Sequence, residues 1–210
     1  VRGVSFVARH GESVGIVGRN GSGKSTLLRA VAGLLPPAHG EVYVAGEPSL
    51  LGVNAVLMPE LSGEKNIMLG GLALGLTPDE VRDRMDEIVD FAGIGDFVYM
   101  PMKAYSSGMG ARLRFAISSA ARPDLLMVDE ALATGDAEFR EKSKARIDAL
   151  RQDAGTVFLV SHSTATIQAM CTRALWLEKG ELKMDGSVDD VCEAYKAATR
   201  PSKRTASRTR

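Results

Sequence analysis

The sequence predicts an α/β domain with a parallel sheet, into which a helical subdomain is inserted. Short apolar runs alternate with helical patterns at both ends of the chain, and a helical stretch of about residues 61–122 lies between them. A glycine-rich stretch separates one apolar run from the helical pattern after it. The 210 residues suffice for one such domain. We expect it to cover residues 1–199 and the basic stretch 200–210 to be a disordered tail, with weak attraction to an anionic membrane surface as the alternative.

Charge and hydropathy argue against nucleic-acid binding and against a segment that spans a membrane. The 26 Lys and Arg residues balance 26 Asp and Glu residues, which speaks against nucleic acid as a partner, although a neutral total can hide a local basic patch. The longest apolar run, Ile67 to Leu76, is too short to span a membrane, and no signal peptide is present. Any work at a membrane would therefore be that of a peripheral subunit. The chain begins at Val1 inside an apparent strand, so we expect a preceding segment.

The first third of the chain is predicted to contain three strands and one helix. Val4 to Val7 and Val14 to Val17 are short apolar runs joined by a turn, and Glu41 to Val44 alternates apolar and polar residues. Between the second and third of these runs, a glycine-rich stretch leads into a helical pattern that ends at Gly33.

The inserted helices and the returning α/β pattern follow. Thr77 and Glu80 form a capping box with Pro78 at the first helical position. The apolar residues that follow share one helix face and are expected in the core: Val81, Met85, Ile88, Val89 and Ala92. Beyond them we expect strands at 125–128 and 156–160, helices at 136–150 and 164–171, a hairpin of 175–179 with 182–184, and a last helix at 188–198.

The glycine-rich stretch from Gly18 to Ser25 fits the pattern G-x-x-x-x-G-K-[ST] at every fixed position, with a strand before it and a helix after it. Such a loop turns its backbone N–H groups towards a phosphate, and the following helix presents its positive end to the same anion. A lysine there contacts the β- and γ-phosphates of a nucleotide, and the hydroxyl after it takes one Mg²⁺ position. The predicted nucleotide-binding residues are Gly18, Asn20, Gly21, Ser22, Gly23, Lys24, Ser25 and Thr26.

Acidic residues end a buried strand at the edge where ligands bind in α/β sheets. Asp129 follows four apolar residues and is expected to hold Mg²⁺ together with Ser25, while Glu130, one residue further, is suited to activate the attacking water. His162 follows the next predicted strand at its carboxyl end. A lone histidine is more often structural, but its place beside the loop favours a γ-phosphate contact that orients the water.

Together these motifs resemble the nucleotide-binding domain of ABC transporters. The stretch 105–109 is similar to the family's signature, with Ser106, Ser107 and Gly108 as phosphate-binding residues; read alone, it would be a helix N-cap. The resemblance implies a P-loop NTPase core of ABC ATPase type (RecA-like), with a small antiparallel β subdomain and the helical insert. It also implies that ATP is clamped between two copies of the chain, with Asp136 of the D-loop at the dimer seam.

Two departures from the family pattern stand out. No Gln lies between Ser49 and Pro59, where family members usually place one at the Mg²⁺, and Asn54 is the nearest candidate to replace it. The aromatic residue that stacks on adenine would precede Val1.

Further motifs resemble a subfamily, the ATP-binding subunits that export teichoic acid, O-antigen and related polysaccharides: Tyr105 to Met109, Pro59 to Ile67 and Gly135 to Phe139. The resemblance implies an ATPase at the cytoplasmic face of the plasma membrane, bound to an integral-membrane permease. The permease is expected to dock near 57–71, with core packing of its apolar residues as the alternative. Competing interpretations are a soluble ABC ATPase of translation or DNA repair and an ATP-binding regulator without hydrolysis.

Overall fold

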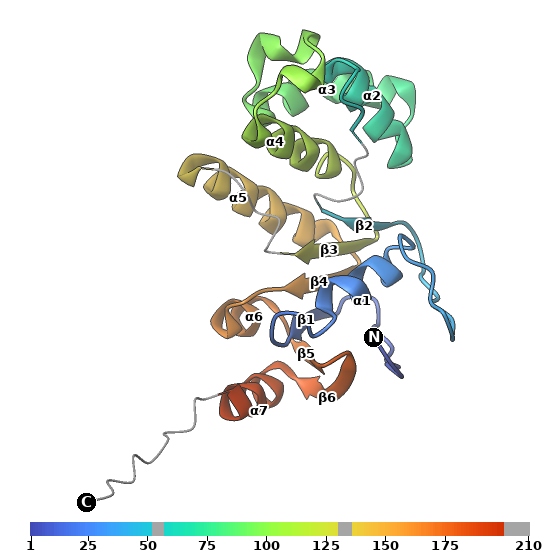
Figure 1. Cartoon of the computed structure of the whole chain (residues 1–210), viewed down its shortest axis with the longest axis vertical. Helices are drawn as coiled ribbons and strands as arrows, with labels where there is room; N and C mark the ends of the chain where they lie inside the picture. Colours follow the sequence, from blue (N-terminus) through green and yellow to red (C-terminus); the bar gives the residue numbers. More distant parts are fainter. Residues whose placement is uncertain (52–56, 130–135, 200–210) are drawn as a thin grey trace, which may run out of the picture.

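The computed structural model describes residues 1–51, 57–129 and 136–199. The predictions for Asn54, for Glu130 and for the tail lie outside these residues. Within them, a mixed α/β core and a group of helices at one end of the molecule are seen side by side (Figure 1). No helix of the described residues is long and apolar enough to cross a membrane.

Six strands form one sheet in the order β2-β3-β4-β1-β5-β6. All neighbours are parallel except β5 and β6, which form the predicted antiparallel hairpin at one edge. Because β1, β3 and β4 run in one direction, their carboxyl ends meet at the same edge of the sheet. The strands are β1 (Ser13–Val17), β2 (Pro48–Leu50), β3 (Leu125–Asp129), β4 (Thr156–Val160), β5 (Arg173–Glu178) and β6 (Glu181–Ser187).

Seven α-helices complete the described fold, and the capping box at Thr77 is confirmed, with Gly93 in the left-handed region (φ 63) ending the same helix. Helices α2, α3 and α4 pack around their own apolar cluster, apart from the two clusters that flank the sheet. The helices are α1 (Lys24–Val31), α2 (Gly63–Ala73), α3 (Pro78–Ala92), α4 (Ser107–Ser118), α5 (Ala137–Asp153), α6 (Thr164–Met170) and α7 (Val188–Thr199), with 3-10 turns at Gly95–Tyr99 and Met102–Ala104.

The predicted strands at 4–7 and 41–44 are wrong as strands. Neither segment belongs to a strand, and Val4, Phe6 and Val44 pack against the cluster on one face of the sheet. However, both segments line one cavity of about 700 Å³. Ladder hydrogen bonds need strands about 4.8 Å apart, and neither segment takes part in a ladder in the described residues. The antiparallel β subdomain implied by the resemblance is therefore represented in the described residues by two unpaired segments.

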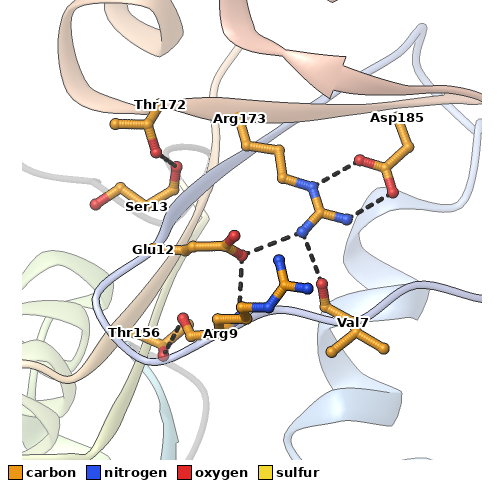
Figure 2. Close-up of polar contacts among 8 residues, drawn as sticks. All are labelled: Val7, Arg9, Glu12, Ser13, Thr156, Thr172, Arg173 and Asp185. Atoms are coloured by element: carbon orange, nitrogen blue, oxygen red, sulfur yellow. Dashed lines mark hydrogen bonds and ion pairs between the residues drawn. The ribbon is translucent and has the colours of Figure 1, made fainter.

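Arg173 ties the N-terminal segment to the sheet (Figure 2). Its guanidinium donates to both carboxylate oxygens of Asp185 at 2.7 Å, to the carbonyl oxygen of Val7 at 2.6 Å and to Glu12 at 3.1 Å. The Glu12 carboxylate also accepts from the backbone N–H of Arg9 at 3.0 Å. The hydrogen bonds to Asp185 are the main reason why the pKa of Arg173 is raised. One mostly buried side chain therefore joins three chain segments.

Replacing Arg173 by Met is expected to lower the free energy of unfolding by about 2 kcal/mol, because two carboxylates in partly buried sites lose a charge-assisted partner. Chemical denaturation measures the change. Lys183→Met is the matched control, since its ion pair with Glu181 on β6 is exposed and is expected to matter little. Equal losses in the two variants would show that the junction adds no stability.

Candidate functional site

The loop between β1 and α1 is shaped by glycines where side chains do not fit. A Cβ at Gly18 would collide with the carbonyl oxygen of Leu177 on β5 and with the Ser22 hydroxyl. Gly23, at the N-cap of α1, has φ 102, which other residues rarely adopt. The apolar strand β1 is buried and holds the start of this loop in the middle of the sheet.

The N-terminus of α1 differs from that of every other α-helix in the part of the chain described. At Gly23 there is no side-chain cap, and the first turn contains no acidic residue. The other six helices are capped by a Ser, Thr or Asp side chain that accepts from a backbone N–H of the first turn. Because uncapped N–H groups and the helix dipole favour a negative charge, α1 fits an anion.

Lys24 lies at this N-terminus and is 7% exposed. Its ammonium donates to the carbonyl oxygens of Gly18 at 2.8 Å and Arg19 at 3.1 Å. Burial lowers the pKa of Lys24, and the nearby Asp129 carboxylate acts in the opposite direction. The cation is therefore held across the loop in a mostly buried position, where its attraction for an anion is stronger than in bulk water.

Asp129 and Ser25 meet as predicted, since the Ser25 hydroxyl donates to the Asp129 carboxylate at 2.8 Å. Asp129 ends β3, and His162 follows β4, its neighbour in the sheet. One cavity of about 330 Å³ brings these groups together. It is lined by Asn20, Gly21, Gly23, Lys24, Ser25, Thr26, Asp129, Val160 and His162. The sequence did not single out Val160, although it is the last residue of the predicted strand before His162.

The predicted signature lies elsewhere. Ser106 is the N-cap of α4, and its hydroxyl accepts from the N–H of Met109 at 3.2 Å. Ser107 and Gly108 are exposed, and none of the three lines the cavity at Lys24. Asp136 is the N-cap of α5, where the N–H of Phe139 and then the Arg112 guanidinium lower its pKa. The chain therefore presents two separate helix N-termini, one at the loop and one at the signature.

The residues present fit Mg²⁺ bound with a phosphate ligand. A hydroxyl and a carboxylate are oxygen ligands, and Mg²⁺ is commonly bound by one or two carboxylates with the remaining positions taken by substrate phosphates and water. In residues 1–51, 57–129 and 136–199, no group of three or more His, Cys, Asp or Glu could hold a metal by protein ligands alone. Ser25 and Asp129 suit a metal that arrives with a nucleotide.

Comparison with known proteins agrees with the resemblance to ABC transporter nucleotide-binding domains. The profile of the ABC transporter family matches residues 1–133. The teichoic acids export ATP-binding protein TagH of Bacillus anthracis is 43% identical over 91% of this chain and 35% of that protein. The O-antigen export system ATP-binding protein RfbB of Myxococcus xanthus is 41% identical over 94% of this chain and 46% of that protein.

Another relative and two solved structures extend the comparison. TagH of Staphylococcus saprophyticus is 40% identical over 91% of this chain and 73% of its own length. A solved ATP binding subunit of an ABC transporter superposes with a TM-score of 0.75, is 25% identical, and covers 91% of this chain and 85% of its own. A dimeric ATP-binding cassette bound to ADP and Pi, with a TM-score of 0.70 and 24% identity over 87% of this chain and 88% of its own, shares the fold.

The chain spans 35–58% of the length of the first curated relatives that it matches. The match to the family covers β1, the loop at 18–25, the signature helix α4 and β3. The chain belongs to the ABC transporter family.

Proposed function

We propose that this chain is the ATP-binding and ATP-hydrolysing part of an ABC exporter for a cell-envelope polysaccharide such as teichoic acid or a related lipid-linked glycan. The observation that carries the proposal is the uncapped N-terminus of α1, which faces the same cavity as Lys24, Ser25, Asp129 and His162. The relatives named as teichoic acid and O-antigen export proteins support the substrate class.

The charged and polar side chains of the cavity, together with Glu130, have separate roles in this proposal. The N–H groups of α1 and the Lys24 ammonium hold the phosphates of ATP. Ser25 and Asp129 would hold Mg²⁺, which would supply positive charge beside the phosphates. Glu130 is the general base that accepts a proton from the attacking water, and His162 orients that water from the carboxyl end of β4. Positioning and electrostatics supply most of the rate enhancement in such reactions.

A second copy of the chain completes the site. Ser106, Ser107 and Gly108 form an exposed helix N-terminus that its own cavity does not use. In a dimer with twofold symmetry, the signature of each copy would face the nucleotide of the other. The isolated protein is then monomeric or weakly associated without nucleotide, because the two ATP molecules form part of the interface.

The permease is proposed to dock on the helical subdomain, at the cytoplasmic face of the plasma membrane. Some apolar side chains of 57–71 are exposed and others are buried. Met58 is 50% exposed and Leu69 41% exposed, whereas Ile67 is fully buried and Met68 packs partly against the helical cluster. Ile67 and Met68 thus serve packing, the alternative weighed from the sequence, while Met58 and Leu69 remain available for a partner.

Met58→Glu and Leu69→Glu are each expected to reduce export about 10-fold or more and to leave basal ATP hydrolysis within about twofold. A charge buried in an apolar interface weakens binding of the permease, whereas the same charge is solvated in the free protein. Export by cells and hydrolysis by the purified protein are the two measurements. Glu64→Gln, at an exposed position of α2, the helix that also contains Leu69, is the control. Loss of folding in either variant would show that these residues belong to the core.

The proposed function is tested with the full-length protein and its permease in proteoliposomes. ATP turnover should rise when a lipid-linked glycan is added and should require the permease. A rate of ATP turnover that does not depend on the permease but changes with RNA, DNA or ribosomes would favour a soluble ABC ATPase of translation or DNA repair. Binding of ATP without turnover would favour a regulator that does not hydrolyse it.

A further inference from the structure

Three phenylalanines join the helical subdomain to the sheet. Phe91 from α3, Phe115 from α4 and Phe139 from α5 lie with ring centroids 5.6–5.9 Å apart, one pair stacked and two edge-to-face. Phe91 packs against both the helical cluster and one cluster of the sheet. We call these rings the aromatic junction. Such pairs add specific geometry to the burial of apolar area.

Two guanidinium groups cover this junction. Arg112 of α4 lies over the Phe139 ring at 5.4 Å, and Arg146 of α5 lies over the Phe91 ring at 5.2 Å. Each also forms an ion pair, Arg112 with Asp136 and Arg146 with Glu87, and their side chains are 26% and 27% exposed. The two arginines are therefore alike in burial, in their aromatic contact and in having a carboxylate partner.

They differ in what the carboxylate does. Glu87 lies within α3, whereas Asp136 is the N-cap of α5. One Asp136 oxygen accepts from the N–H of Phe139 at 2.9 Å, and the other accepts from Arg112. Arg112 thus contacts the first turn of α5 in two places, the Asp136 cap and the Phe139 ring. It belongs to α4, the helix that Ser106 starts.

We infer that Arg112 is a positioning residue that fixes Asp136 relative to the signature at Ser106, so that both elements meet the partner subunit as one rigid surface. This inference rests on the proposed function, in which both elements lie at the dimer seam. A contact made across an interface is productive only when its parts are held in register, and small misplacements are costly. Arg112 lines no part of the cavity in its own chain, so it should leave ATP binding by the monomer unchanged.

The test uses the full-length protein with Glu130→Gln, which blocks hydrolysis. Sedimentation at saturating Mg-ATP gives the dimer dissociation constant, and a fluorescent ATP analogue at low protein concentration gives the affinity of the monomer. Arg112→Met is expected to raise the dimer dissociation constant at least ~10-fold with unchanged nucleotide affinity. Arg112→Lys, which keeps the charge but loses the planar fork, should give an intermediate value.

Arg146→Met is the matched control and should change the dimer dissociation constant by less than ~2-fold, because it uncovers the same junction without touching Asp136. Equal effects of the two Met variants would overturn the inference, since only the stability of the junction would then matter. If Arg112→Met fails to fold, the Arg112→Lys variant decides the question. A dimer of this variant as tight as that of the parent would overturn the inference, and a weaker dimer would support it. A parent that forms no dimer with Mg-ATP would instead overturn the proposed dimer, and the inference with it.

Discussion

Lys24→Ala is expected to lower the rate of ATP hydrolysis by about 10³-fold or more. The change removes a buried cation from a site where one well-placed donor is commonly worth 10²- to 10³-fold in rate. It also removes two hydrogen bonds to the carbonyl oxygens of Gly18 and Arg19. Both losses fall on the proposed phosphate site, and no other described cationic side chain lines that cavity to replace them.

The measurement is phosphate release by the full-length protein at saturating Mg-ATP. Lys65→Ala, at an exposed position of α2, should retain the parent rate. Circular dichroism of both variants separates a catalytic loss from unfolding. A folded Lys24→Ala variant with activity within about threefold of the parent would refute the phosphate assignment.

Glu130→Gln is expected to slow hydrolysis at least ~10²-fold, the usual contribution of a general base, and to leave ATP binding intact. The amide keeps the size of the side chain but cannot accept the proton of the attacking water. It also relieves repulsion against the γ-phosphate. Single-turnover hydrolysis and equilibrium binding are the measurements. Lost ATP binding would identify Glu130 as a metal ligand and contradict the division of roles between it and Asp129.

Because this variant hydrolyses its bound ATP only slowly, the Glu130→Gln protein should accumulate as an ATP-bound dimer, which size-exclusion chromatography detects. Gly108→Asp on this background should abolish the dimer by placing a carboxylate against phosphate. The structure also bears on whether Gly108→Asp disturbs the monomer. A Cβ at Gly108 meets nothing closer than the Ser106 hydroxyl at 3.9 Å, and Gly108 is exposed, so the monomer accepts a Cβ at this position.

Local sequence patterns predicted the parts of the fold that depend on neighbouring residues. The loop at 18–25 and the buried strand before Asp129 combine residue types that suit one conformation only, with glycine at positive φ and an apolar run between polar ends. The capping box at Thr77 is likewise complete within four residues. Such features need no knowledge of the rest of the chain.

Contacts between distant residues were beyond this kind of reasoning. The apolar run at 4–7 was predicted to be a strand, yet strand formation also depends on a second segment that pairs with it, and 4–7 has none among the described residues. Arg173 and Arg112 each join segments far apart in the sequence, and nothing local marks them among the other arginines. The candidate cavity was predictable because parallel strands bring their carboxyl ends together; the aromatic junction was not.

The missing cap of α1 links the nucleotide supply of the cell to the folding stability of the protein. Every other described α-helix carries its own N-terminal acceptor, whereas α1 would obtain one from a bound phosphate group. A ligand that binds only the folded state stabilises it by about 2.7 kcal/mol at a concentration one hundred times its dissociation constant. Bound ATP is therefore expected to raise the free energy of unfolding of this chain, with its phosphate as the acceptor that α1 lacks.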